Sequence, residues 1–160
     1  HSVAVNSGTS ALHIACLALG VGTGDAVWTT PNTFVASANC VRYCGAEVDF
    51  VDINTKTWCL YAERLAEKLE RHQSDGLPLP KAVIPVHLSG QSCDMQAIAG
   101  LGRRYGFSII EDASPADILS AIPTLSLFGL PAQGHYTRAR MGRAAGADGS
   151  ISPTAPGIHG

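Results

Sequence analysis

Short apolar, β-branched runs alternate with segments of helical periodicity from residue 1 to residue 113, and this alternation restricts the fold more than any other feature. A strand, a helix and a second strand make a βαβ unit, whose two strands pair in parallel. We therefore predict an α/β fold with a mainly parallel sheet and helices on both of its faces. The expected strands are residues 3–5, 26–30, 47–51, 81–86 and 107–110.

Capping residues and glycines predict where the helices begin and end. Ser7 is placed to cap a helix that Gly20 ends, and Asp94 is placed to cap the last one. Residues 34–44 and 61–72 are the other two expected helices, the second being the most amphipathic.

The strand–helix rhythm stops after Ser114. Residues 115–160 contain five of the nine prolines and seven of the seventeen glycines, but no lysine and no glutamate. This composition predicts an irregular tail after a first part that ends at residue 114. The chain also starts in the middle of an expected strand, without Met, which suggests a fragment of a longer protein.

Composition argues against several classes of function. Eleven Lys and Arg against thirteen Asp and Glu leave no basic face for nucleic acid. The apolar runs fall short of the roughly 20 residues that span a bilayer, so we expect no membrane segment and a cytoplasmic location. The five cysteines show no CxxC or Cys/His zinc spacing, which predicts reduced, mostly buried thiols and no metal site.

The segment Asn6-Ser7-Gly8-Thr9-Ser10 lies at the expected start of the first helix. Backbone N–H groups and the positive end of the helix dipole favour an anion there, and Gly8 permits close approach. The hydroxyls of Thr9 and Ser10 suit phosphate oxygens. The segment is neither a Walker loop nor GxGxxG, and Ser7 could instead be an ordinary helix cap.

Asp112 follows an apolar strand and should emerge at the carboxyl edge of the sheet, where α/β proteins bind ligands. A carboxylate there can stabilise a protonated pyridine nitrogen, or it can simply cap a turn. Phe34 follows another strand and could lie over a flat ring, or pack in the core. His87 also ends a strand, where packing or a hydrogen bond to substrate is the expected role.

Five segments, in this order, resemble the DegT/DnrJ/EryC1/StrS family of PLP-dependent sugar aminotransferases. They read VNSGTSAL from residue 5, TPNTFVAS from residue 30, GAEVDFVD from residue 45, PVHLSG from residue 85 and IEDAS from residue 110. The resemblance implies a fold of type I, here incomplete, and a homodimer. It also implies transfer of an amino group from glutamate to a nucleotide-linked 4-keto-6-deoxy sugar. The members whose segments are most similar to these use a UDP-linked sugar.

The resemblance also assigns roles to single residues. Gly8, Thr9 and Ser10 would hold the phosphate of pyridoxal 5'-phosphate (PLP), Phe34 would stack on its ring, and Asp112 would pair with its ring nitrogen. No catalytic residue can be assigned, because the family's Schiff-base lysine, in a Ser-x-x-x-x-Lys segment beyond the aspartate, has no counterpart here.

Two departures separate this chain from the family pattern. Pro115 stands where the family has a His or Gln near the ring, and no lysine follows Lys81. Lys56 and Lys68 also precede the aspartate, in segments expected to lie away from the ring. A shift of reading frame near Ser114 would produce both departures; a diverged terminal segment is the alternative.

These features leave two functions open for the chain. One is a part of an aminotransferase that is itself inactive for lack of the lysine. The other is a non-catalytic binding module that keeps the phosphate turn. An NAD-binding domain is disfavoured, because the first turn lacks GxGxxG.

Overall fold

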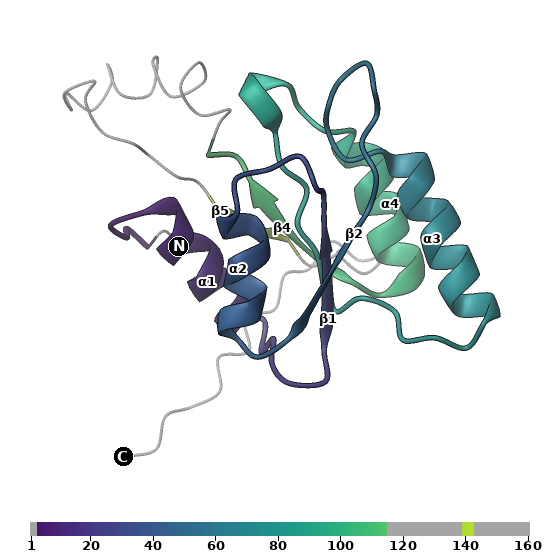
Figure 1. The fold of residues 1–160 in the computed structure, drawn as a ribbon, viewed down its shortest axis with the longest axis horizontal. Helices are drawn as coiled ribbons and strands as arrows, with labels where there is room; N and C mark the ends of the chain where they lie inside the picture. Colours follow the sequence, from purple (N-terminus) through teal and green to yellow (C-terminus); the bar gives the residue numbers. More distant parts are fainter. Residues whose placement is uncertain (1–2, 115–138, 143–160) are drawn as a thin grey trace, which may run out of the picture.

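A computed structural model describes residues 3–114 and 139–142 (Figure 1). Its sheet has the strand order β2-β1-β3-β4-β5. The first four strands pair in parallel and β5 pairs with β4 in the antiparallel direction. The strands are β1 (Ala26–Thr29), β2 (Glu47–Phe50), β3 (Ala82–Val83), β4 (Ser108–Asp112) and β5 (Ala139–Gly142). The predicted α/β fold with a mainly parallel sheet is confirmed.

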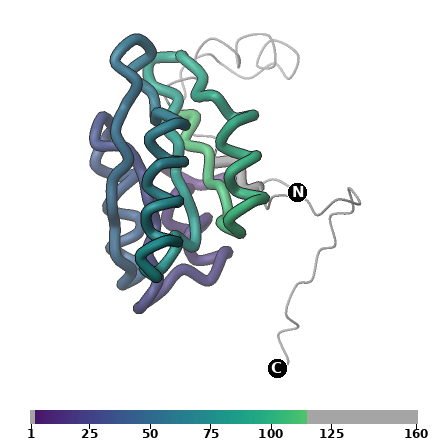
Figure 2. The backbone as a smooth tube through the Cα atoms, turned by 90° about the vertical axis from the view of Figure 1, so that its right-hand side faces the viewer, coloured from purple at the N-terminus to yellow at the C-terminus, as the bar shows by residue number. Residues whose placement is uncertain are grey.

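In the described part of the chain, helices cover both faces of the sheet (Figure 1). They are α1 (Gly8–Ala18) and α2 (Ala36–Tyr43) on one face, and α3 (Ala62–Ser74) and α4 (Met95–Tyr105) on the other. Figure 2, turned by a quarter, places α3 and α4 in front of the sheet. A short 3-10 turn, η1 (Leu88–Gly90), connects β3 to α4. Each helix therefore packs one face on the sheet, as the βαβ pattern requires.

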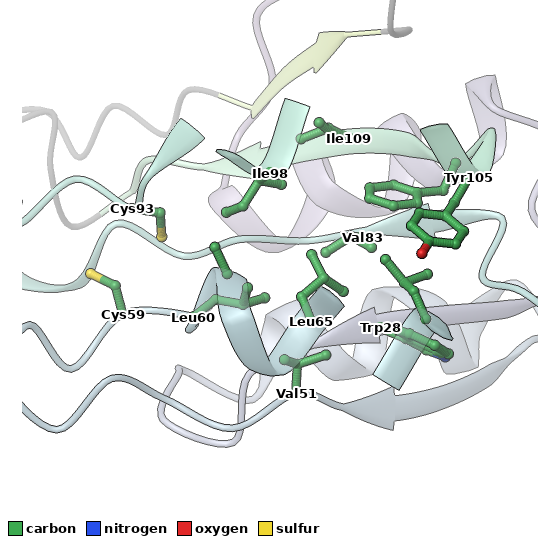
Figure 3. Close-up of a cluster of buried hydrophobic side chains, with 13 residues drawn as sticks. Trp28, Val51, Cys59, Leu60, Leu65, Val83, Cys93, Ile98, Tyr105 and Ile109 are labelled. Atoms are coloured by element: carbon green, nitrogen blue, oxygen red, sulfur yellow. The ribbon is translucent and has the colours of Figure 1, made fainter. Parts of the chain in front are cut away.

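Two apolar cores result, one on each face of the sheet. The core under α3 and α4 contains Trp28, Leu65 and Ile98, all buried, and Figure 3 shows Cys59 and Cys93 at one end of it. The core under α1 and α2 is built of smaller side chains, among them Leu12 and Cys40. Small residues let these two helices approach closely, so that the Sγ atoms of Cys16 and Cys40 lie 3.8 Å apart.

Capping follows the sequence closely. The Ser7 side chain accepts from the backbone N–H of Ser10, and that of Asp94 accepts from Ala97. Gly20 adopts a φ of 66° directly after α1, a left-handed conformation that glycine takes without strain. The local signals thus determine where α1 and α4 begin and where α1 ends.

The prediction of a strand at Val3–Val5 is wrong. These residues form no regular element, and Val3 is 79% exposed. A strand needs a neighbour to pair its backbone groups, and among the described residues none lies beside this segment. The apolar run alone could not reveal that.

The predicted irregular tail lies outside the described residues except at Ala139–Gly142. There the structure differs from the prediction, because these four residues form β5 beside β4. Composition could not predict this pairing, since the strand is formed by its neighbour's free edge and not by an apolar run of its own.

Lys81 connects the start of β3 to the loop before β1 at the amino edge of the sheet. Its Nζ donates to the Gly20 carbonyl at 2.7 Å and lies 2.8 Å from Asp25 Oδ2. The hydrogen bond from Lys81 is the main cause that lowers the pKa of Asp25 below its ordinary 3.8. Since both side chains are about one third exposed, solvent screens the pair.

We predict that Lys81→Met lowers the free energy of unfolding by about 1 kcal/mol or less at pH 7. Because the folded state depresses the pKa of Asp25, the contribution of the pair is complete above pH 3.8 and is lost as the pH falls through the folded value. Urea unfolding at pH 7 and near pH 3 measures this. A difference between the two proteins that grows on acidification would contradict the assignment.

Candidate cofactor site

The candidate residues gather at the carboxyl edge of the sheet, the upper edge in Figure 1. The β1–α2 connection and the end of β4 lie there, and the amino end of α1 faces the same way, because its carboxyl end leads down into β1. In open α/β sheets this edge is where ligands bind. The fold thus brings the phosphate turn, Phe34 and Asp112 to one edge.

The turn before α1 has the features of an anion site. Gly8 and Thr9 open the helix, so their N–H groups have no acceptor within it, and the positive end of the helix dipole faces outward. Both residues are half-buried. Ser7 caps the helix as the alternative interpretation held, through the N–H of Ser10 and not through those of Gly8 and Thr9.

Ser10 is less available than the sequence suggested. Its hydroxyl donates to Asn6 Oδ1 at 2.8 Å and lies 2.9 Å from Ser7 Oγ. A hydroxyl has one proton, and this one is used inside the turn. Thr9 and the backbone N–H groups are therefore the more direct donors for a phosphate, and Ser10 must rotate to join them.

Asp112 ends β4 and is only 4% exposed. Its Oδ2 accepts from Ser37 Oγ at 2.8 Å, and its Oδ1 accepts from the backbone N–H of Ser114 at 3.2 Å and from Ser114 Oγ. The alternative interpretation as a turn cap is thus confirmed for Oδ1. An ionised carboxylate has about four acceptor positions, so roughly one remains for a further donor.

Phe34 lies on the surface, not in the core. It is 75% exposed and lies just before Val35, the N-cap of α2, three residues before the Ser37 that contacts Asp112. The alternative interpretation as a core residue is therefore wrong. An exposed aromatic ring is available to contact a flat ligand, so the stacking role suggested by the sequence stays a prediction.

His87 is buried, and its ring nitrogens contact other residues of the fold. Its Nδ1 accepts from the backbone N–H of Cys93 at 3.1 Å, so in the neutral ring the proton is on Nε2. Nε2 lies 3.6 Å from Glu111 Oε2. These contacts connect the turn after β3 to the end of β4, in agreement with the expected packing role.

Two of the three lysines are held by contacts of their own, Lys68 also through the Phe50 carbonyl at the carboxyl end of β2. Lys81 fastens the amino edge, and Lys68 Nζ lies 2.6 Å from Asp49 and over the Trp28 ring at 4.5 Å. Lys56 is exposed in the loop that follows β2. Neither Lys68 nor Lys81 can reach a ligand at Asp112 without giving up these contacts.

All five cysteines are free thiols, and four of them are buried. Burial is the main cause that raises the pKa of Cys93 to about 12, while the hydrogen bond with Cys16, followed by burial, raises that of Cys40. Such thiols stay protonated at neutral pH and act as core side chains. Among residues 3–114 and 139–142 no cluster of metal-ligating side chains occurs, and no helix there is both long and apolar enough to cross a membrane.

Comparison with known proteins agrees with this geometry. The sequence profile of the DegT/DnrJ/EryC1/StrS aminotransferase family matches residues 1–119. The chain belongs to this family. The match ends five residues after Ser114, close to the point where the strand–helix rhythm stops.

Curated relatives share sequence over the same part. The chain is 44% identical over 116 residues to GDP-perosamine synthase of Caulobacter vibrioides, which covers 72% of this chain and 29% of that protein. It is 42% identical to the spore coat polysaccharide biosynthesis protein SpsC of Bacillus subtilis, covering 72% and 28%. The chain thus spans less than a third of the length of these relatives.

Solved structures of the family share the fold. A DegT/DnrJ/EryC1/StrS aminotransferase from Brucella abortus superposes with a TM-score of 0.65 at 36% identity, over 68% of this chain and 29% of that one. NtdA from Bacillus subtilis, with bound pyridoxamine 5'-phosphate (PMP), gives 0.61 at 38% identity, over 68% and 23%. The family's aminotransferases are PLP enzymes of fold type I, and this chain has part of that fold.

The residues present fit such a cofactor in three respects. The opening turn of α1 offers N–H groups to a phosphate, Asp112 keeps about one acceptor position for a ring N–H, and Phe34 exposes an aromatic face. Sequence reasoning missed Ser37, the residue that holds Asp112 from α2. Only the contact between α2 and the end of β4 reveals it, because a serine in the first turn of a helix gives no signal by itself.

Proposed function

We propose that this chain is the cofactor-binding part of a nucleotide-sugar aminotransferase. The observation that carries the proposal is Asp112, a carboxylate buried at the carboxyl edge of a parallel sheet, at the edge to which the opening turn of α1 points. The cofactor, when bound, supplies a ring that accepts electrons from the carbon that gains or loses the amino group.

Each residue at the edge has one part in this proposal. The N–H groups and hydroxyl at Gly8 and Thr9 bind the phosphate, with Ser10 as a further donor after rotation. Phe34 covers one side of the ring. Asp112 stabilises the proton on the ring nitrogen, because an opposite charge favours the charged form.

The chain alone binds without catalysing, in this proposal. Amino transfer in the family needs the lysine that bonds to PLP and carries a proton, and no lysine follows Lys81. The second candidate function, a non-catalytic binding module, is favoured by the same observation. A frame shift near Ser114 remains our explanation for the missing segment, and it predicts a Ser-x-x-x-x-Lys segment in another frame of the nucleotide sequence.

We propose a sugar with a 4-keto-6-deoxy ring as the amino acceptor of the complete enzyme, with glutamate as donor. The five family-like segments favour a UDP-linked N-acetyl sugar of pseudaminic acid biosynthesis, whereas the Caulobacter relative is named for a GDP-linked sugar. An extended chain that includes the Ser-x-x-x-x-Lys segment, given glutamate and either keto sugar, distinguishes the two. Turnover of the GDP-linked sugar alone would contradict the UDP assignment.

A homodimer is part of the proposal. Exposed apolar side chains on α1, Ile14 at 44% and Leu17 at 54%, are consistent with a surface that a second copy covers. Light scattering of the purified chain measures this directly. A mass near twice 16.7 kDa is expected, and a stable monomer at micromolar concentration would contradict the assignment.

Titration of PMP into the chain tests the proposed function. We expect saturable binding of about one PMP per chain, weakened by inorganic phosphate, since both would use the N–H groups of α1. Calorimetry gives the stoichiometry and the affinity. No heat above that of a phosphate-only titration would contradict the proposal.

We further predict that PLP forms no stoichiometric covalent bond with a lysine of this chain. Lys68 and Lys81 are engaged by Asp49 and Asp25, and Lys56 is an exposed side chain in the loop after β2, with no lysine-to-ring contact to hold it in place among the described residues. Borohydride reduction followed by peptide mass mapping measures any lysine–PLP bond. One equivalent of adduct on a single lysine would overturn the prediction, whereas scattered, substoichiometric labelling agrees with it.

A further inference from the structure

Two hydroxyl side chains, Thr33 just before α2 and Ser37 in its first turn, form a chain of hydrogen bonds that ends at Asp112. Thr33 Oγ1 lies 2.8 Å from Ser37 Oγ, and Ser37 Oγ lies 2.8 Å from Asp112 Oδ2. Ser37 is fully buried and Asp112 nearly so, which makes these contacts insensitive to competition from water.

The direction of both hydrogen bonds follows from counting protons. An ionised carboxylate can only accept, so the single hydroxyl proton of Ser37 points to Asp112. Ser37 Oγ can then only accept from Thr33, whose hydroxyl proton points to Ser37. The two hydrogen bonds run the same way, toward the carboxylate, and each polarises the other.

We propose that Ser37 is a positioning residue for the ring-nitrogen contact, holding Asp112 Oδ2 so that the remaining acceptor position of the carboxylate faces the cofactor. Thr33 supports Ser37 in the same role. The inference rests on the proposed function. The inference goes beyond the proposed function because it names a residue that touches no cofactor atom and still determines how strongly the ring nitrogen is bound.

Geometry makes this role specific. Oδ1 of Asp112 accepts from Ser114 on its own strand end, whereas Oδ2 is held from α2, on a different element. Without Ser37 the carboxylate keeps a tether on one oxygen only and can turn about it. Hydrogen bonds to a charged group contribute more than neutral ones, so the loss of this one affects the orientation of the charge.

The test combines a residue change with a ligand change. PMP is compared with its 1-deaza analogue, in which C–H replaces the ring nitrogen, on the unaltered chain and on Ser37→Ala. We expect Ser37→Ala to weaken PMP binding by about tenfold and to leave binding of the analogue unchanged. Thr33→Val, which keeps the shape of the side chain, should weaken PMP binding by a smaller factor.

Ser74→Ala is the control, because it removes the same hydroxyl group from a helix far from the candidate edge, where Ser74 Oγ donates to the Glu70 carbonyl on α3. It should change neither affinity. Circular dichroism identifies a variant that does not fold; if Ser37→Ala fails to fold, Ser37→Cys and Thr33→Val give the same comparison.

Equal losses for both ligands would overturn the inference, because Ser37 would then support the fold and not the nitrogen contact. No loss for either ligand would overturn it too. If the unaltered chain binds PMP no better than the analogue, the nitrogen contact of the proposed function fails, and this inference fails with it. Discrimination by the unaltered chain that Ser37→Ala retains in full removes only the role of Ser37.

Discussion

Asp112→Asn should weaken PMP binding by roughly 30-fold or more, because removing the charge from a buried pair leaves its partner without compensation. The substitution preserves the shape of the side chain, and the amide oxygen can still accept from Ser37 or Ser114. What it removes is the negative charge that stabilises the proton on the ring nitrogen. Calorimetric titration of the two proteins with PMP measures the ratio of affinities.

Asp75→Asn provides the matched control. Asp75 is an exposed carboxylate at the end of α3, near the amino edge of the sheet, and its change to an amide should leave PMP affinity within a factor of two or so. An equal loss in both variants would mean that net charge and not the site sets the affinity. Unchanged binding by Asp112→Asn would remove the residue from the candidate site.

Leu65→Ala should lower the free energy of unfolding by about 2 to 5 kcal/mol. Leu65 is fully buried in the core under α3 and α4, where Figure 3 places it between Val51 and Val83. A domain holds roughly 5 to 15 kcal/mol in total, so this loss is a large part of it. Urea unfolding followed by circular dichroism measures the change.

Leu77→Ala is the control for that substitution. Leu77 follows α3 and is 48% exposed, so the same atoms are removed at little cost, about 0.5 kcal/mol or less. Similar unfolding midpoints for the two variants would show that the core under α3 and α4 is not packed as described.

Most of the fold could be predicted from the sequence because its signals are local. Alternating apolar runs and helical periods predicted β1 to β4 and α1 to α4, and single residues such as Asp94 predicted the helix ends. The predictions that failed concern strands, because a strand forms only where a neighbouring strand can pair with it. The run at Val3–Val5 has no partner strand among the described residues, and Ala139–Gly142 forms a strand only because β4 offers an edge.

In the candidate site, too, local signals could be read from the sequence and contacts between distant residues could not. The position of Asp112 at the end of an apolar strand predicted its place at the carboxyl edge, and the structure has it there. The sequence could not show that Phe34 is exposed or that Ser10 is engaged by Asn6. Nor could it show the role of Ser37, which lies 75 residues from Asp112 along the chain and contacts it only because α2 packs against the end of β4.

The proposed function separates binding from catalysis in this chain, because no lysine follows Lys81. Every contact proposed for the phosphate and the ring nitrogen lies within residues 8–112, and the step that needs the lysine does not. We therefore expect cofactor recognition without turnover, so that the contribution of each contact to affinity can be measured alone.

Mapping PMP onto the chain by amide chemical shifts is the most direct test of the central claim. On titration of PMP, the account predicts that the largest shifts occur together at the carboxyl edge, at residues 8–10, 33–37 and 112–114. Residues 20–25 and 76–81, at the amino edge around Lys81, should not move. Shifts centred on that opposite edge, or spread evenly over the chain, would contradict a cofactor site at Asp112.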